Sequence, residues 1–290
     1  MIDYHVHLWR HRPNLSLQAS VEQIAEYCEH AAGLGVTELA ITEHTSRFVQ
    51  FDAAMRGWWE TDPNPELRAA TLKYWDEEMG ADLDQYVETA LAARDAGLPV
   101  VIGMEVDYFP GQMEKTASLL QGYPFDVLLG SVHWIGAWLI NELSWAVAEQ
   151  EWASRGVDRV WDDYTRSVEE LAATGAVDVL AHPDLVKISG HRPPVPDEFH
   201  QRIAEAARAS GIAAELNSAG WRRHGAVEAY PAPALLQRFR DLKVPITTAS
   251  DGHDVDYVSW RIEDLTTMAR AAGYTEVTTF RGRSPRARPL

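Results

Sequence analysis

The feature that most constrains the fold is a unit of one short strand and one helix that recurs along the chain. Seven brief, almost continuous apolar runs alternate with amphipathic segments, and several of these segments end at a glycine just before the next run. Such runs are typical of strands buried on both faces of a parallel sheet, and glycine is a common C-terminal cap of helices. The predicted strands are residues 2–7, 37–44, 99–108, 125–134, 178–185, 213–220 and 246–253.

The segments between these strands have the apolar spacing of helices. The clearest examples are residues 20–35, 83–97, 164–175, 197–211 and 232–243. Strands that alternate with helices predict right-handed βα units around a parallel sheet. Seven units favour an α/β fold closed into a barrel, and a doubly wound open sheet is the alternative that spacing alone does not exclude.

The repeated units fill one predicted domain, residues 1–280. The chain then ends in RGRSPRARPL, residues 281–290. Arginine and proline dominate this stretch and no apolar period is present, so the sequence predicts a basic, flexible tail.

The composition limits which kinds of binding partner, and which cellular compartment, we expect for this protein. The formal net charge is −17, whereas a nucleic-acid-binding protein normally presents a basic face to the phosphates. No apolar run is long enough to span a bilayer, and the first residues do not resemble a signal peptide. Cys28 is the single cysteine, which excludes an internal disulfide. We therefore expect a cytoplasmic protein with a small-molecule substrate and with neither nucleic acid nor membrane as partner.

Side chains that can bind metals fall at the ends of six of the seven predicted strands. In α/β barrels the C-terminal strand ends share one face and form the active site, so these side chains should converge. Six of the eleven histidines occupy such positions, which random scatter would not produce. The residues are His5, His7, His44, Glu105, His133, His182, Asp251 and His253.

The chemistry of this set indicates the metal. Histidine and carboxylate ligands without a thiolate suit Zn, Mn or Fe ions. Eight ligands exceed what one catalytic ion takes, so the set predicts two or three ions, with a carboxylate such as Glu105 or Asp251 bridging them. Sites with several metals suit the hydrolysis of phosphate esters.

Four motifs carry a resemblance to a known family. DYHVH, ITEH, the pair GMEVDY and GSVHW continued by AHPDL, and SDGH occur here in that order. Together they resemble the polymerase and histidinol phosphatase (PHP) superfamily, from residue 2 to about residue 275. The resemblance implies a distorted (β/α)7 barrel of the TIM type with a trinuclear metal centre at the strand C-termini.

The resemblance also implies how the ligands are shared. His5, His7, Glu105 and Asp251 would hold one ion, and Glu105 with His133 and His182 would hold a second. His44 and His253 would hold a third, together with a histidine from the loop after the first strand. That loop reads LWRHRPNLS and lacks the family's Cys-x-His-Ala-like stretch, so His11 is the candidate for this remaining ligand.

Within the superfamily, the middle region and the segment from ELNSAGW to SDGH resemble the histidinol-phosphatase group. This implies a phosphomonoesterase of histidine biosynthesis that converts L-histidinol phosphate to L-histidinol and phosphate. A hydroxide formed at ions held by Glu105, Asp251 and His133 would attack phosphorus. One alternative is a PHP phosphoesterase acting on a nucleotide or sugar phosphate. The other, a non-catalytic accessory module of a polymerase, is disfavoured by the complete ligand set and the negative charge.

Basic residues near the strand ends are candidates for binding phosphate, because the forked guanidinium of arginine suits this anion. Arg222 and Arg223 follow the sixth strand, and the resemblance designates Arg222 as the first choice. Lys187 and Arg47 are further candidates. The sequence does not select a general acid: Glu43, Asp184 and Asp254 lie beside ligands, and we expect Asp184 to orient a histidine instead.

Overall fold

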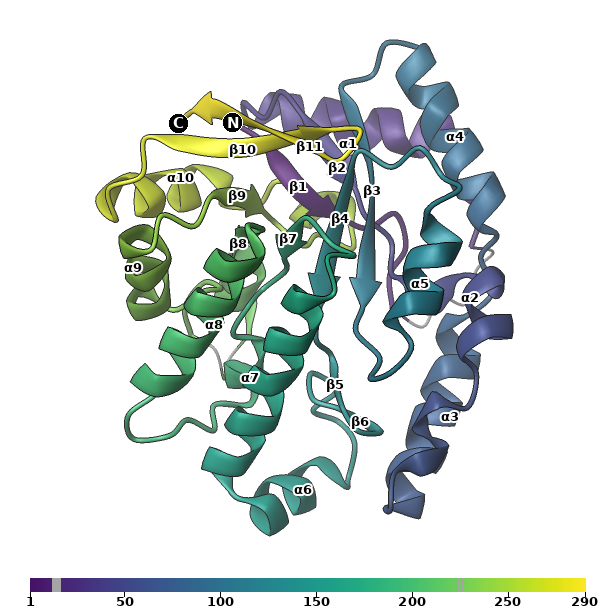
Figure 1. Cartoon of the computed structure of the whole chain (residues 1–290). Coiled ribbons are helices and arrows are strands. Elements are labelled where there is room, and N and C mark those ends of the chain that lie inside the picture. Colours follow the sequence, from purple (N-terminus) through teal and green to yellow (C-terminus); the bar gives the residue numbers. More distant parts are fainter. Residues whose placement is uncertain (12–16, 224, 226) are drawn as a thin grey trace.

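A computed structural model describes residues 1–11, 17–223, 225 and 227–290. Its centre is a seven-stranded parallel sheet in the order β1-β2-β3-β4-β7-β8-β9 (Figure 1). The strands are β1 (Asp3–Val6), β2 (Leu39–Ile41), β3 (Val100–Asp107), β4 (Val127–Ser131), β7 (Val179–Leu180), β8 (Ala213–Asn217) and β9 (Ile246–Ala249). Every residue of these strands is buried, which explains the continuous apolar runs.

The first and last strands meet and close the sheet. The His7 amide donates to the Gly252 carbonyl at 2.8 Å, and the Asp251 amide donates to the His5 carbonyl at 2.8 Å. The buried Asp3 carboxylate accepts hydrogen bonds from the Ser250 amide and from its hydroxyl. The predicted closure of the α/β fold into a barrel is therefore confirmed, and the open sheet is excluded.

Helices surround the strands (Figure 1). They are α1 (Val21–Gly33), α4 (Leu83–Asp95), α5 (Met113–Leu120), α7 (Val157–Ala173), α8 (Asp197–Ser210), α9 (Pro233–Asp241) and α10 (Ile262–Ala271). Of these, α5 and α10 are additional to the five that the sequence analysis named. Local sequence explains where they begin: the Ser20 side chain accepts from the Gln23 amide and caps α1, while Pro233 opens α9. The five predicted helices are confirmed, and their bounds agree to within a few residues except at the start of α7, which begins at Val157 and so seven residues before the predicted start.

Two insertions follow β2 and β4. The first contains α2 (Val49–Met55) and α3 (Pro65–Glu78), with the short 3-10 turns η1 (Thr45–Arg47) and η2 (Trp58–Thr61). The second contains β5 (Trp134–Ile135), β6 (Trp138–Leu139) and α6 (Ala148–Arg155). Further 3-10 turns are η3 (Leu185–Ser189), η4 (Ser218–Arg222) and η5 (Val255–Tyr257). None of the helices in the described ranges has the length and apolar character needed to span a membrane.

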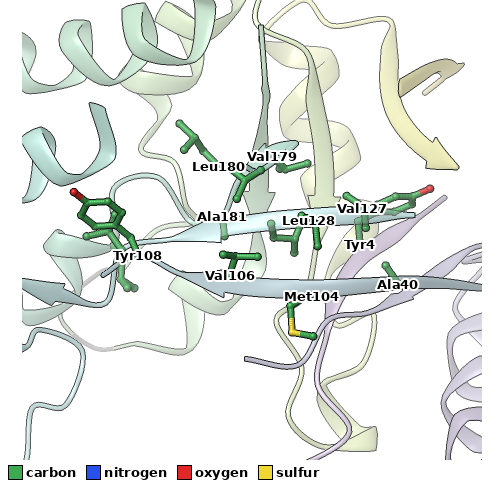
Figure 2. Packing of buried hydrophobic residues seen from close by; sticks show 14 of the residues in the cluster. Tyr4, Ala40, Met104, Val106, Tyr108, Val127, Leu128, Val179, Leu180 and Ala181 are labelled. Atoms are coloured by element: carbon green, nitrogen blue, oxygen red, sulfur yellow. The ribbon is translucent and has the colours of Figure 1, made fainter. Parts of the chain in front are cut away.

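The core packs apolar side chains of neighbouring strands against one another. Figure 2 shows Val106 of β3, Leu128 of β4 and Ala181 beyond β7 close together. Space is tight enough to require glycine: a Cβ atom at Gly130 would lie 2.8 Å from a methyl group of Val177. This packing holds the strand ends in fixed relative positions.

The C-terminal stretch differs from the flexible tail that the sequence predicted. β10 (Glu276–Arg281) and β11 (Ser284–Pro289) form an antiparallel hairpin across the end of the barrel opposite β5 and β6 (Figure 1). The Gly282 turn adopts φ +54°, and the Arg283 guanidinium lies 3.0 Å from the Asp178 carboxylate. The tail is ordered because of these non-local contacts, which composition does not reveal.

Candidate metal centre

The strand ends bring the eight predicted ligands into one largely buried cluster. His5 of β1 and His7 just after the strand flank Val6, so both imidazoles lie on the same side. Their Nε2 atoms are 3.1 Å apart, and Asp251 Oδ1 lies 3.9 Å from the first and 3.4 Å from the second. His7 is also stacked on His253, with ring centroids 4.0 Å apart.

Glu105 of β3 is the hub of the cluster. Its Oε2 atom lies 3.1 Å from His5 Nε2 and 3.0 Å from His44 Nδ1. Its Oε1 atom lies 3.0 Å from His182 Nε2 and 3.6 Å from His133 Nε2. Burial raises the pKa of this carboxyl, but the neighbouring His44, His5 and His133 outweigh burial and hold it well below its ordinary value. His7 Nε2 also lies 3.4 Å from Oε2. An ionised, buried carboxylate shared by five imidazoles can bridge metal ions.

Four overlapping groups of side chains in the described residues could each hold a divalent ion. The ligand atoms within a group lie within 4.8 Å of one another. The groups are His7, His44 and His253; His5, His7 and Asp251; His5, Glu105 and His182; and His44, Asp107 and His133.

Asp107 is a member of these groups that the sequence analysis missed. Its Oδ1 atom lies 3.0 Å from His133 Nδ1 and 3.4 Å from His44 Nδ1. Burial raises its pKa, but His44 and His133 reverse this and lower it. The signal was available: Asp107 follows Glu105 by two residues, and alternate residues of a strand face the same side.

A second layer of carboxylates lies behind the histidines. Glu215 Oε2 is 2.9 Å from His5 Nδ1, and Glu43 Oε2 is 3.6 Å from His7 Nδ1. Such partners fix the tautomer and the orientation of metal-binding imidazoles. Burial lowers the pKa of His5, yet Glu215, Glu105 and Asp251 together raise it well above its ordinary value. Glu43 therefore lies where it can orient His7. The sequence analysis did not identify Glu215, because the predicted strand that contains it carries none of the predicted metal ligands.

His11 lies beside the cluster. It lines the same cavity as His44 and His253, with its ring centroid 4.4 Å from that of His253. Its Nδ1 atom is 3.3 Å from the Tyr74 hydroxyl and 3.4 Å from Arg47 Nη2. This leaves Nε2 as the nitrogen able to bind a metal. The side chain therefore lies near the position predicted for the third ion, although none of the four ligand groups in the described residues includes His11.

Comparison with known proteins agrees with this geometry. The PHP domain model matches residues 3–219. The chain belongs to the PHP domain family.

Relatives of this PHP chain carry a common name. A probable histidinol-phosphatase of Deinococcus radiodurans is 32% identical over 258 residues, which cover 89% of this chain and 90% of that protein. The crystal structure of a Lactococcus lactis histidinol phosphate phosphatase, complexed with zinc, L-histidinol and phosphate, has a TM-score of 0.68 at 18% identity, covering 98% of each chain. A putative histidinol phosphatase of Listeria monocytogenes has a TM-score of 0.70 at 19% identity, covering 91% of this chain and 99% of that one. At these identities the two structures show a shared fold.

In this PHP chain the two adjacent arginines after β8, Arg222 and Arg223, have different surroundings. Arg222 Nη2 donates to the carbonyls of Ser250 at 3.2 Å and Asp251 at 2.9 Å, and its guanidinium lies 4.6 Å from the Tyr257 ring centroid. Arg223 lines the cavity together with the metal-binding side chains. The geometry thus favours Arg223 over the first choice, Arg222, which instead supports the loop that carries Asp251.

The other two basic candidates are buried and do not line the cavity. Lys187 Nζ lies 2.8 Å from Asp184 Oδ2 and donates to the Ala229 carbonyl at 2.8 Å. Arg47 lies 3.5 Å from both Glu43 and Glu78, and donates to the Trp9 carbonyl at 3.1 Å. Both cations are therefore placed to stabilise the loops beneath the site.

Two of the carboxylates considered as general acids also have partners. Asp184 accepts from the Ala232 amide at 2.7 Å in addition to pairing with Lys187. Asp254 pairs with Arg10 and caps η5 through the Asp256 amide. Asp184 thus organises a loop, which differs from the expected role of orienting a histidine.

Proposed function

We propose that this PHP protein is a metal-dependent phosphomonoesterase that hydrolyses L-histidinol phosphate to L-histidinol and phosphate. The observation that carries the proposal is the buried convergence of imidazoles on Glu105, beside a cavity with Arg223 at its rim. The name of the Deinococcus radiodurans relative, at 32% identity over nearly the whole chain, supports the choice of substrate.

The residues fit two or three divalent ions of Zn, Mn or Fe. Buried imidazole nitrogens, including His44 Nε2 and His253 Nε2, have no hydrogen-bond partner among the described residues. Unpartnered nitrogens beside ionised carboxylates are what a bound cation requires. We assign the ions to His5, His7, His11, His44, Glu105, Asp107, His133, His182, Asp251 and His253. When bound, the ions supply Lewis acidity that neutralises phosphate charge and lowers the pKa of water.

The chain's own residues would bind and orient the ester. Arg223 can place its guanidinium against two phosphoryl oxygens. Asn141 lines the same cavity, and its Oδ1 atom is buried without a partner among the described residues, so it can accept an N–H of the organic part. Leu185, Ile188 and Ala219 complete an apolar wall. In the reaction a water oxygen bonds to phosphorus, the bond from phosphorus to the ester oxygen breaks, and the released alcohol takes up a proton.

A panel of phosphomonoesters tests this function. Purified protein with added Mn²⁺ or Zn²⁺ is assayed for phosphate release from L-histidinol phosphate, p-nitrophenyl phosphate, a nucleoside monophosphate and a sugar phosphate. We expect kcat/KM for histidinol phosphate to exceed the others by about 10²-fold or more, because the polar groups that contact its organic part remain unpaired with other substrates. Hydrolysis of histidinol phosphate no faster than that of p-nitrophenyl phosphate would contradict the proposal.

A further inference from the structure

One wall of the cavity contains polar groups that do not belong to the metal-binding set. The described residues that form it are Asn141, Leu185, Ile188, Ala219, Arg223 and Tyr230. Among these, the Tyr230 hydroxyl combines two properties. The residue is only 1% exposed, and the hydroxyl oxygen has no hydrogen-bond partner among the described residues. A buried hydroxyl without a partner destabilises a fold, so its presence requires an explanation.

The position of Tyr230 is fixed from several sides. Its amide donates to the Asn217 carbonyl at 3.0 Å, and the Asn217 amide donates to the Tyr230 carbonyl at 2.6 Å. The ring meets the His182 imidazole edge to face at a centroid distance of 6.1 Å, and Lys187 Nζ lies 5.1 Å from the ring centroid. The side chain therefore stands between a metal-binding histidine and a buried cation, with little freedom to seek another partner.

The chemistry of the Tyr230 hydroxyl indicates which kind of group it can bind. A phenol keeps its proton at neutral pH, so the Tyr230 hydroxyl can donate a hydrogen bond to an acceptor in the cavity. Arg223 lies in the same segment after β8 as Tyr230, and both residues line the cavity, so this segment offers two donors to an anion bound there. Rigid donors aimed at developing negative charge stabilise transition states strongly.

We propose that the Tyr230 hydroxyl donates a hydrogen bond to a phosphoryl oxygen of the bound ester, next to Arg223, and so acts directly on the reacting group. The inference rests on the proposed phosphomonoesterase function. It involves no covalent step, because the phenol keeps its proton throughout.

The test is Tyr230→Phe, which removes only the hydroxyl. In the metal-loaded protein we expect kcat/KM to fall about 10²-fold for both L-histidinol phosphate and p-nitrophenyl phosphate. Inorganic phosphate should inhibit more weakly, the metal content should be unchanged, and the melting temperature should be equal or higher because an unpaired buried hydroxyl is lost. Tyr274→Phe is the matched control: its hydroxyl donates to the Val244 carbonyl at 3.0 Å, away from the cavity, and its loss should leave kcat/KM unchanged.

Three outcomes would overturn the inference. Unchanged kcat/KM would show that the hydroxyl does not act on the substrate. A loss confined to histidinol phosphate would place it on the leaving group, since p-nitrophenolate needs no proton to depart. Loss of bound metal would assign Tyr230 to holding His182. If the substrate proposal alone is wrong, the wild-type protein will not prefer histidinol phosphate, yet Tyr230→Phe will still slow p-nitrophenyl phosphate hydrolysis.

Discussion

The two ends of the barrel differ in whether their buried polar groups have hydrogen-bond partners. At the end covered by the β10–β11 hairpin, Asp126 and Asp178 accept from the amides of Ile102 and Leu128 and pair with Arg94 and Arg283. At the other end, His44 Nε2, Asn141 Oδ1 and the Tyr230 hydroxyl have no partner among the described residues. One end uses its polar groups to stabilise the fold, and the other leaves them for ligands, which is the usual division of labour in α/β barrels.

The largest effect that this contrast predicts is on Glu105. Because its carboxylate contacts five imidazoles, Glu105→Gln should lower kcat/KM by at least about 10³-fold and reduce the number of metal ions bound, measured by elemental analysis. Thorough chelation of the wild-type protein should abolish activity, and added Mn²⁺ or Zn²⁺ should restore it. Full activity in the chelated sample would disprove a metal-dependent reaction.

Arg223 and Arg222 form a matched pair of neighbours with different expected roles. Arg223→Ala should lower kcat/KM about 10²-fold with little change in melting temperature, because it loses a phosphate contact. Arg222→Ala should instead lower the free energy of unfolding by about 1–3 kcal/mol, because two buried carbonyls lose their donor. Kinetics and thermal denaturation of both variants check this, and the reverse pattern would restore Arg222 as the phosphate ligand.

A substitution of Glu215 tests whether the carboxylates behind the histidines support metal binding. Glu215→Gln keeps the shape of the side chain but removes the charge that faces His5 Nδ1 at 2.9 Å. Metal affinity should fall by about 10–100-fold, with activity recovered at high metal concentration. A titration in which affinity is unchanged would show that the carboxylate does not orient His5.

Protons should compete with metal for the same end of the barrel. Burial lowers the pKa of His44, but Glu105 and Asp107 outweigh burial and raise it to about 10 in the metal-free protein. At neutral pH a metal must therefore displace a proton, and its apparent affinity should rise by up to about tenfold per pH unit below that pKa. Calorimetry in buffers of different ionisation enthalpy measures this release, and metal binding without any proton release would contradict it.

The smallest effect belongs to the hairpin end. Arg283→Ala breaks the pair with Asp178, in which the arginine side chain is 39% exposed, so the free energy of unfolding should fall by no more than about 1 kcal/mol. Activity and metal content should be unchanged, since Arg283 lies at the end of the barrel opposite the histidine cluster. A clear loss of activity would show that the two ends of the barrel are coupled.

Sequence alone determined the repeated βα units and the face on which the metal-binding side chains meet. Both depend on local regularities: a strand alternates its side chains with period two, and parallel strands in βα units end on the same side. The convergence of His5, His7 and His133 on Glu105 follows from spacing, and the position of Asp107 follows from the same rule.

Tertiary structure decided the features that depend on distant contacts. It distinguished Arg223 from Arg222, because only the fold brings the Ser250 and Asp251 carbonyls to one of them. It turned the arginine-rich end into a hairpin by supplying Asp178 as a partner, and it left the Tyr230 hydroxyl without a partner among the described residues. The direction of a loop side chain depends on contacts with residues that are distant in the sequence. The local periodicity of the sequence does not identify those residues.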